Sequence, residues 1–326
     1  MSSTPGDWRP GASAGRLRQR AEKLAQVRAF FAARGVLEVD TPQLVNRAVT
    51  DVNIHSAEVR WPRDDERPRY LHTSPEYAMK RLLAAGSGDI YQMCHVFRGE
   101  EQGPLHNSEF MIVEWYRRGW ALAALMDEVD ALVRALMGPA SLAATRSVSY
   151  EQAFVEALGC NPLSDDDASM LERARRAGFE DALLLRCDRN ELLDLLMGAC
   201  VGPQLGHEGP VFIHRYPASQ AALARLDPHD ARVALRFELY LRGVELANGF
   251  EELGDATEQR ARFAADQRSR AARNLAVPEM DQLLLAALDA GLPPCSGVAL
   301  GFDRLLMLAC NAKRIDEVMA FTSERA

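Results

Sequence analysis

The segment RFELYLRGVELANGFEELGD, residues 236–255, constrains the fold most strongly because apolar and polar side chains alternate on both sides of an Arg-Gly pair. A period of two is typical of a strand with one buried face, and a two-residue connection is typical of a hairpin. The segment therefore predicts two antiparallel strands in which Tyr240 pairs with Glu245. Glu238 then lies diagonal to Glu245 on the same face of the sheet, roughly 7 Å away.

Three glutamates of this segment, Glu238, Glu245 and Glu252, are spaced seven residues apart, and this spacing leaves a solvated helix face as the alternative. The alternation and the glycines disfavour the helix. Carboxylates that converge on a sheet repel one another unless a cation joins them, and their hard oxygen atoms suit Mg²⁺, which usually arrives with phosphates. Glu238 and Glu245 are therefore candidate magnesium ligands.

The rest of the chain continues this mixture of strands and helices. Further strands are predicted at residues 36–42, 90–98 and 109–117, and helices at 16–33, 74–86, 121–136 and 168–199. Because hairpin signals rather than regular βαβ units join the strands, we expect an antiparallel α+β fold. Residues 1–15, which contain much Ser, Gly and Pro, predict a flexible tail before one domain at 16–326 with a helical insertion at about 121–205.

Composition indicates an ordinary globular chain, since 326 residues with 48% apolar and 26% charged content suffice for one large or two modest domains. No apolar run approaches the ~20 residues of a membrane span, and the start lacks the apolar region of a secretory signal. We therefore expect a cytoplasmic protein without a membrane partner. The six cysteines are scattered without a C-x-x-C pair, which disfavours a disulfide framework or a zinc site.

The formal net charge of −8 disfavours a nucleic-acid partner, because proteins that hold polyanions usually present a basic surface. The one basic cluster, RLRQRAEK at residues 16–23, is interpreted as the solvated face of a helix, since apolar residues recur behind it at helical spacing.

The segment CSGVALGFDRLL, residues 295–306, predicts a glycine-punctuated strand that runs into a helix at Asp303. Gly297 and Gly301 allow a ligand to approach the backbone closely, and Arg304 in the first helical turn could hold a phosphate with its planar guanidinium. An ordinary buried joint between a strand and a helix is the alternative for this segment taken alone.

Three segments together resemble motifs 1, 2 and 3 of the class II aminoacyl-tRNA synthetases, and specifically the lysine enzyme. They are residues 34–42, the run FRGEEQGPLHNSEFMIVEWY at 97–116, and GVALGFDRL at 297–305. Supporting runs are TSPEYAMKRLL at 73–83, FIHRYPASQAALAR at 212–225 and ELANGFEEL at 245–253. The resemblance covers about residues 16–326. It implies a six-stranded antiparallel sheet flanked by helices and a homodimer formed through motif 1.

The fifteen residues before the first predicted helix cannot build the anticodon-binding OB domain that precedes the catalytic domain of lysyl-tRNA synthetases. The chain is therefore similar to the free-standing paralogues that attach (R)-β-lysine to a lysine of translation elongation factor P. This resemblance implies an ATP-dependent, Mg²⁺-dependent ligase that forms an aminoacyl-adenylate from (R)-β-lysine or lysine. It implies a protein acceptor and no tRNA.

The resemblance also implies roles at the ATP side of the site. Arg98 holds the α-phosphate and the carboxylate being activated, Arg304 holds the γ-phosphate, and both count as catalytic because negative charge grows there. Glu238 and Glu245 hold Mg²⁺. The remaining predicted contacts to ATP are Gly99, Glu100, His106, Asn107, Phe110, Leu246 and Gly301. Phe110 is expected to stack on the base, with plain core packing as the alternative.

At the amino acid side, a substrate with two ammonium groups needs carboxylates in a site that excludes water. The resemblance implies that Glu76 meets the amine near the reacting carboxyl. Glu114, Tyr116 and Glu252 meet the distal ammonium. The full set of predicted contacts to the amino acid is Ser74, Pro75, Glu76, Glu114, Tyr116, Glu252 and Ala299.

Two positions depart from the family pattern. Gly99 stands where Asn is usual, which predicts a looser loop, and Ala299 stands where lysyl-tRNA synthetases have Gly. The added methyl group is either harmless or changes discrimination between substrates by ~1–3 kcal/mol, which could favour a β-amino acid.

Two other functions remain open: a truncated synthetase that charges tRNA, and an inactive dimer that senses lysine or ATP. The presence of Arg98, Glu238, Glu245 and Arg304 disfavours the inactive dimer. The missing OB domain and the lack of basic character disfavour the synthetase.

Overall fold

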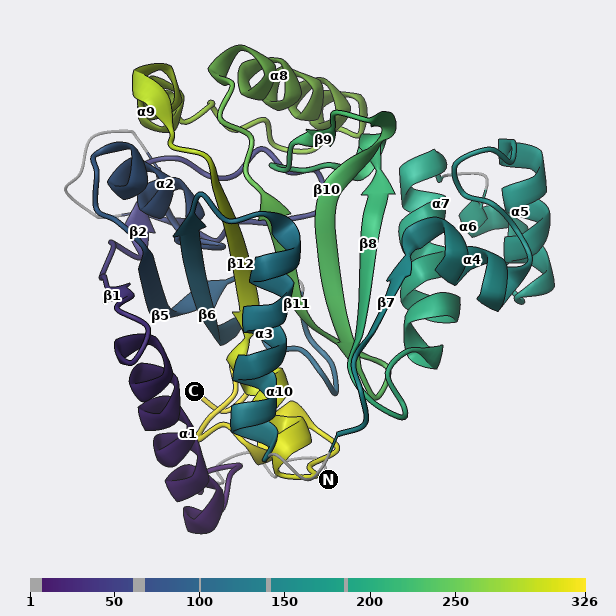
Figure 1. The fold of residues 1–326 in the computed structure, drawn as a ribbon. Helices are drawn as coiled ribbons and strands as arrows, with labels where there is room; N and C mark the ends of the chain where they lie inside the picture. Colours follow the sequence, from purple (N-terminus) through teal and green to yellow (C-terminus); the bar gives the residue numbers. More distant parts are fainter. Residues whose placement is uncertain (1–7, 61–67, 100, 139–141, 185–186) are drawn as a thin grey trace.

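The computed structural model of the protein describes residues 8–60, 68–99, 101–138, 142–184 and 187–326 (Figure 1). The central feature is a nine-stranded sheet with the order β1-β5-β6-β12-β11-β10-β8-β7, in which β9 pairs with β10. Its strands are β1 (Leu37–Glu38), β5 (Ile90–Phe97), β6 (Glu109–Arg118), β7 (Arg146–Ser149), β8 (Val211–Pro217), β9 (Leu226–Asp227), β10 (Asp230–Leu241), β11 (Val244–Glu251) and β12 (Cys295–Gly301).

The sheet is mixed, which corrects the expectation of a purely antiparallel one. The six strands from β5 to β8 in the sheet order are antiparallel to their neighbours, as expected. Two short strands extend the sheet in parallel, β1 beside β5 and β7 beside β8. The run at 36–42 was predicted to be a strand throughout, but only two of its residues pair, and proline closes the run.

The hairpin of β10 and β11 has the predicted register, because Tyr240 pairs with Glu245. Arg242 and Gly243 form its turn with φ of 53° and 74°, as a two-residue hairpin turn with both residues in the left-handed region requires. A bulge follows, since the next pairs are Leu239 with Ala247 and Glu238 with Asn248. The extra residue turns both Glu245 and Asn248 toward the same face, although they lie three positions apart.

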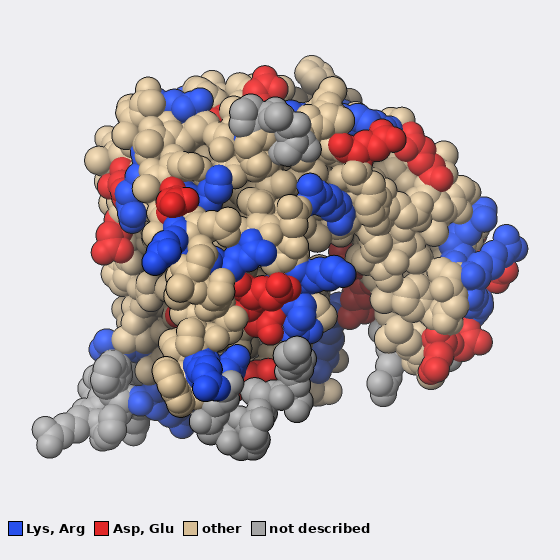
Figure 2. Space-filling view, turned by 90° about the horizontal axis from the view of Figure 1, so that it is seen from below, with Lys and Arg blue, Asp and Glu red and all other residues tan. Residues whose placement is uncertain are grey.

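Charged side chains of both signs are interspersed over the face seen in Figure 2. Within the described residues, no helix is long and apolar enough to cross a bilayer. All six cysteines are described and carry free thiols.

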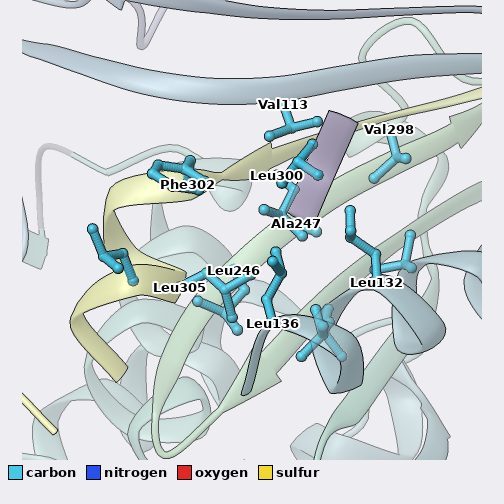
Figure 3. Packing of buried hydrophobic residues seen from close by; sticks show 14 of the residues in the cluster. Val113, Leu132, Leu136, Leu246, Ala247, Val298, Leu300, Phe302 and Leu305 are labelled. Atoms are coloured by element: carbon cyan, nitrogen blue, oxygen red, sulfur yellow. The ribbon is translucent and has the colours of Figure 1, made fainter. Parts of the chain in front are cut away.

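The main hydrophobic core lies on one face of the sheet, under α1 (Ala14–Ala32), α3 (Leu122–Met137) and α10 (Phe302–Ala309). Figure 3 shows Leu132 and Leu136 of α3 directed toward Val298 and Leu300 of β12 and Ala247 of β11. Burial of apolar surface contributes a free energy of ~25 cal/mol per Å², so the contacts of this layer are the main interaction that holds the helices on the sheet.

A second cluster forms around the helices that follow β7, which stand apart from the main body in Figure 1. They are α4 (Tyr150–Leu158), α5 (Asp167–Arg176), α6 (Asp181–Leu184) and α7 (Arg189–Leu196), followed by short helical turns through Gln204. Asp166 caps α5 by accepting a hydrogen bond from Ser169 N. The helix α3 was expected to belong to the same insertion, at about 121–205, but it packs on the main core.

Three further helices and a small sheet complete the other side of the molecule. The helices are α2 (Glu76–Ala84), α8 (Ala256–Ala272) and α9 (Gln282–Gly291), and the three-stranded sheet has the order β2 (Leu44–Val45), β4 (Arg69–Leu71), β3 (Glu58–Val59).

Candidate active site

A cavity of about 710 Å³ opens on the face of the central sheet that α3 does not cover. This volume suits a small-molecule ligand. Strand alternation creates it, because Val113 and Trp115 of β6 point into the core while Glu114 and Tyr116 point into the cavity. Its walls come from α7, α8, the start of α2 and the segment 49–54.

Most of the predicted site residues line this one cavity. They are Ser74, Glu76, Arg98, His106, Asn107, Phe110, Glu114, Tyr116, Glu238, Glu245, Leu246, Glu252, Ala299, Gly301 and Arg304. Pro75 and Gly99 lie next to lining residues in the chain, and Glu100 lies outside the described residues.

One row of paired residues crosses four strands of the cavity floor. Glu114 pairs with Ala299, Ala299 with Asn248, and Asn248 with Glu238. Strand pairing therefore brings together residues that are more than a hundred positions apart in the chain.

The first end of the cavity, called the arginine end below, contains Arg98, His106, Phe110, Glu245 and Arg304. Arg98 stacks over the ring of Phe110, with its guanidinium carbon 5.2 Å from the ring centre. Its Nη1 lies 3.5 Å from Glu101, for which the sequence suggested no role, and its Nε donates a long 3.4 Å bond to Thr73 O. These loose contacts leave most of the five N–H donors of Arg98 free for a ligand.

Arg304 enters the same end from the first turn of α10. It donates to the backbone oxygens of Leu105 at 3.3 Å and Glu245 at 3.1 Å. Burial and the charges of Arg304 and Arg98 lower the pKa of His106, so this imidazole is neutral at pH 7. The end thus presents two cations and one neutral ring.

Glu238 lines the cavity near Glu245, close enough for the two carboxylates to repel each other, and their role as metal ligands stays a prediction. Enclosure in the cavity and the charge of Glu238 raise the pKa of Glu245, although 42% of the Glu245 side chain stays open to the cavity. Two repelling carboxylates of this kind fit a divalent cation. The described residues include no group of three or more potential metal-binding side chains, so phosphate oxygens would have to complete the coordination.

Arg236 holds Glu238 in place and was not predicted from the sequence. It donates to Glu238 Oε1 at 2.5 Å and to Asn248 Oδ1 at 3.2 Å, and its guanidinium carbon lies 4.3 Å from the centre of the Tyr216 ring. Tyr240 donates to the other oxygen, Glu238 Oε2, at 2.7 Å. Each oxygen keeps one lone pair for a cation.

The second end of the cavity, called the carboxylate end below, is lined by Ser74, Glu76, Glu114, Tyr116 and Glu252, and Lys80 is buried next to it, against Glu76 and Glu252. Ser74 Oγ accepts from Glu76 N at 3.0 Å and donates to Glu114 Oε2 at 2.7 Å, which fastens the start of α2 to β6. Tyr116 OH donates to Glu114 Oε1 at 2.7 Å. Burial and the charge of Glu76 raise the pKa of Glu114 to about 7.

Lys80 lies between two of these carboxylates and was not predicted as a site residue. Its Nζ is 2.7 Å from Glu76 Oε1 and 2.6 Å from Glu252 Oε2, and its side chain is only 2% exposed. Burial alone would lower the pKa of Lys80, but Glu252 and Glu76 outweigh this effect and raise it. Burial raises the pKa of Glu252 to about 8 even though Lys80 opposes the change.

Gly297 has no side chain, and this allows β12 to lie close to Tyr116 and Glu252. A Cβ atom at this position would lie 2.3 Å from Tyr116 Cε1 and 2.5 Å from Glu252 Oε1. The close approach predicted for Gly297 is therefore confirmed, and the crowding atoms belong to the carboxylate end. At Gly301 the nearest atoms would be 3.8 Å away, which is ordinary contact.

Gly99 and Asn107 are fixed by contacts with the protein. Gly99 N donates to His55 O at 2.7 Å, and a Cβ atom at position 99 would lie only 3.3 Å from this oxygen. Asn107 Oδ1 accepts from the backbone and side chain of Ser323, and Nδ2 donates to Glu109 O. The amide of Asn107 thus holds the C-terminal segment on motif 2, and a contact with adenine stays a prediction.

Ala299 and Leu246 occupy the border between the two ends. Ala299 packs beside Phe110 and the buried Ile112, and it pairs with Glu114. Leu246 lines the cavity at the bulge while its side chain belongs to the main core.

Comparison with known proteins agrees with this geometry. Residues 7–325 match the family described as tRNA synthetases class II (D, K and N). Proteins named elongation factor P (R)-β-lysine ligase from Pectobacterium carotovorum, Pectobacterium atrosepticum and Salmonella typhi are each 48% identical over 329 residues, which cover 100% of both chains. The chain therefore belongs to the class II aminoacyl-tRNA synthetase family, and within it to the elongation factor P (R)-β-lysine ligases.

Proposed function

We propose that this protein is an ATP-dependent ligase that activates (R)-β-lysine as an adenylate and transfers it to a lysine amine of translation elongation factor P. The observation that carries the proposal is the division of one cavity into an arginine end and a carboxylate end on the same four strands. The arginine end presents cations that can bind a nucleoside triphosphate, and the carboxylate end presents anions that can bind a diamino acid. The names of the 48% identical relatives supply the substrate and the acceptor.

In the first half-reaction, an oxygen of the substrate carboxylate attacks the α-phosphorus of ATP and pyrophosphate leaves. Negative charge grows on the phosphoryl oxygens, and Arg98 is suited to meet it because its guanidinium is already oriented over Phe110. Arg304 would hold the γ-phosphate. Mg²⁺ held by Glu238 and Glu245 would neutralise the phosphate oxygens.

The carboxylate end would orient the substrate during this step. Glu76 at the start of α2 would bind the amine nearer the reacting carboxyl, while Glu114 and Glu252 would bind the distal ammonium. Tyr116 would keep Glu114 in position through its hydrogen bond. Ammonium groups favour the ionised form of these carboxyl groups, whose pKa values burial has raised.

In the second half-reaction, the neutral amine of an acceptor lysine attacks the adenylate carbonyl carbon and AMP leaves. The interspersed charges on the face in Figure 2 and the net charge of −8 favour a protein acceptor over a polyanion. We propose a homodimer through motif 1, where Leu37 in β1 is 55% exposed on the edge strand of the sheet.

A direct test is to incubate the protein with ATP, Mg²⁺ and either α-lysine or (R)-β-lysine, and to measure ATP–pyrophosphate exchange. Elongation factor P or bulk tRNA is then offered as acceptor, and the intact mass of the factor and the aminoacylation of tRNA are recorded. We expect exchange with (R)-β-lysine and a mass gain of the factor. Charged tRNA with unmodified factor would favour a synthetase, and absence of exchange with any amino acid would favour a sensor.

A further inference from the structure

Lys80 is buried directly against two carboxylates that line the carboxylate end of the cavity, and the reaction described above gives it no role. It projects from α2, one turn after Glu76, and ends between Glu76 and Glu252 at 2.7 and 2.6 Å. The Lys80 side chain is 2% exposed and the Glu252 side chain is 1% exposed. This ammonium group is therefore sealed inside the region where a diamino acid would place its own ammonium groups.

A purely structural ion pair is the simplest alternative explanation, since Glu76 and Lys80 have the i,i+4 spacing of ordinary helix pairs. Such pairs lie on surfaces, whereas this one is buried, and a buried ion pair is seldom more stabilising than an apolar replacement. Moreover, Glu252 comes from the end of β11, far from α2 in the chain. The stability of the fold therefore does not explain why a lysine is buried at position 80.

The charges of the carboxylate end supply a reason. Glu76, Glu114 and Glu252 carry three negative charges when ionised, and Lys80 carries one positive charge, so the end has a net charge of −2 once all three carboxyl groups are ionised. A ligand with two ammonium groups neutralises this charge. A ligand with one ammonium group leaves a buried negative charge without a partner, which is strongly unfavourable.

We propose that Lys80 is a positioning residue that holds Glu76 and Glu252 apart and sets the charge of the carboxylate end to match two ammonium groups. This inference rests on the proposed function, because it takes a diamino acid as the ligand. Lys80 does not touch the reacting atoms. It selects the substrate by fixing how many positive charges the site still requires.

The ionisable groups around Lys80 make the role measurable. Those that face it or its partners are Glu76 on α2, Glu114 and Tyr116 on β6, Glu252 after β11, and Cys295 on β12. Without Lys80, the pKa of Glu252 would rise above about 8, because Lys80 is the largest influence that lowers it. The proton that Glu252 carries at neutral pH would then be held more tightly, and a diamino acid would have to displace it at a greater cost in affinity.

The test compares wild-type protein with Lys80→Met by ATP–pyrophosphate exchange with (R)-β-lysine between pH 6.5 and 9. At pH 7 we expect the KM for the diamino acid to rise at least tenfold, while the KM for ATP stays within twofold. The rise should shrink toward pH 9, because the carboxyl groups ionise there without help. Arg81→Met, one position along on the exposed side of α2, is the matched control and should leave both KM values within twofold.

A second comparison keeps the proposal testable if Lys80→Met does not fold. Glu76→Gln leaves a net charge of −1, and Glu76→Gln combined with Lys80→Met restores −2. We expect the double variant to bind the diamino acid at least as well as Glu76→Gln alone. If the losses of diamino acid affinity in the two single variants add up in the double variant, the role of Lys80 is structural and the proposal is overturned.

The remaining outcomes separate this inference from the proposed function. An unchanged KM in Lys80→Met, or a loss of equal size at every pH, overturns the role of Lys80 alone. If the wild-type protein shows no pyrophosphate exchange with any amino acid, the proposed function is overturned, and the role of Lys80 with it.

Discussion

The two ends of the cavity are built in opposite ways from the same strands. At the arginine end the charged side chains are partly open, with Arg98 29% and Arg304 22% exposed, and their hydrogen bonds to the protein are between 3.1 and 3.4 Å long. At the carboxylate end the ion pair of Lys80 and Glu252 is almost fully buried, and short bonds connect Ser74, Glu114 and Tyr116.

The difference follows from the ligands that the two ends are proposed to hold. A triphosphate brings several charges and its own cation, so partly exposed donors at an open rim can gather around it. A diamino acid differs from its competitors by one methylene or by the position of one amine, and such small differences require a rigid site. The carboxylate end obtains this rigidity by carrying its own counter-ion.

The largest expected effect concerns the arginine end. Arg98→Ala should lower the rate of pyrophosphate exchange on the order of 10²-fold or more, because this donor acts where charge develops. The KM for the diamino acid should change little. Stopped-flow or steady-state exchange assays give both values. Glu101→Gln is the control, since Glu101 contacts Arg98 at 3.5 Å without lying on the reaction path; an equal loss in both variants would contradict the account.

A somewhat smaller effect is expected when the carboxylate end is filled. In Gly297→Ala the new methyl group would meet Tyr116 and Glu252 at 2.3 and 2.5 Å, so both must move. We expect the KM for the diamino acid to rise at least tenfold with the KM for ATP nearly unchanged. Gly198→Ala, where no atom lies within 4 Å of the new methyl group, is the matched control, and circular dichroism checks that both variants fold. Equal increases in the KM for the diamino acid and the KM for ATP would contradict separate binding roles for the two ends.

The pH dependence should also differ between the two ends. Glu114 and Glu252 have pKa values raised to about 7 and 8 in the empty protein, so each must lose a proton before it can pair with an ammonium group. The KM for the diamino acid should therefore fall as the pH rises from 6 to 8.5. His106 has a lowered pKa and is already neutral, so this group should contribute no pH dependence to the KM for ATP over this range. A diamino acid KM that is independent of pH would be contrary evidence.

The same carboxyl groups affect stability in the opposite direction. Their raised pKa values mean that the folded protein keeps protons which the unfolded chain has lost, so the free energy of unfolding falls as the pH rises from about 5 toward 8. Diamino acid binding should offset this loss. Thermal melts should consequently show a ligand-induced increase in Tm that grows between pH 6 and pH 8.5.

The smallest effect is expected at the border of the two ends. Ala299→Gly removes one methyl group between Phe110 and Glu114. We expect the ratio of kcat/KM for (R)-β-lysine and α-lysine to shift by ~1–3 kcal/mol toward α-lysine. An unchanged ratio would show that this methyl group is harmless.

The hairpin of β10 and β11 shows what the sequence could predict. Its alternation and Arg-Gly turn gave the correct pairing of Tyr240 with Glu245, because hydrophobic period and turn chemistry are local properties. The bulge at Leu246 has no comparable local signal, so the partner of Glu238, Asn248, was not predicted. A strand was expected where β1 lies, but its parallel pairing with β5 was not predicted, and β7 was missed altogether, since parallel pairing depends on distant partners.

Lys80 and Arg236 show why part of the site stayed hidden. Lys80 follows Glu76 by four positions, and this spacing normally indicates an exposed helix pair. Its burial depends on Glu252, which comes from a distant strand. Arg236 lies two positions before Glu238 on β10, so alternation places both on the cavity face, and this was the available signal.

The division of the cavity can be measured most directly by calorimetric titration of three proteins with two ligands. Wild-type protein, Glu252→Gln and Arg304→Ala are each titrated with (R)-β-lysine and with a non-hydrolysable ATP analogue in Mg²⁺. We predict that Glu252→Gln loses affinity for the diamino acid alone and that Arg304→Ala loses affinity for the nucleotide alone. If either variant weakens both ligands equally, the two ends do not have separate tasks.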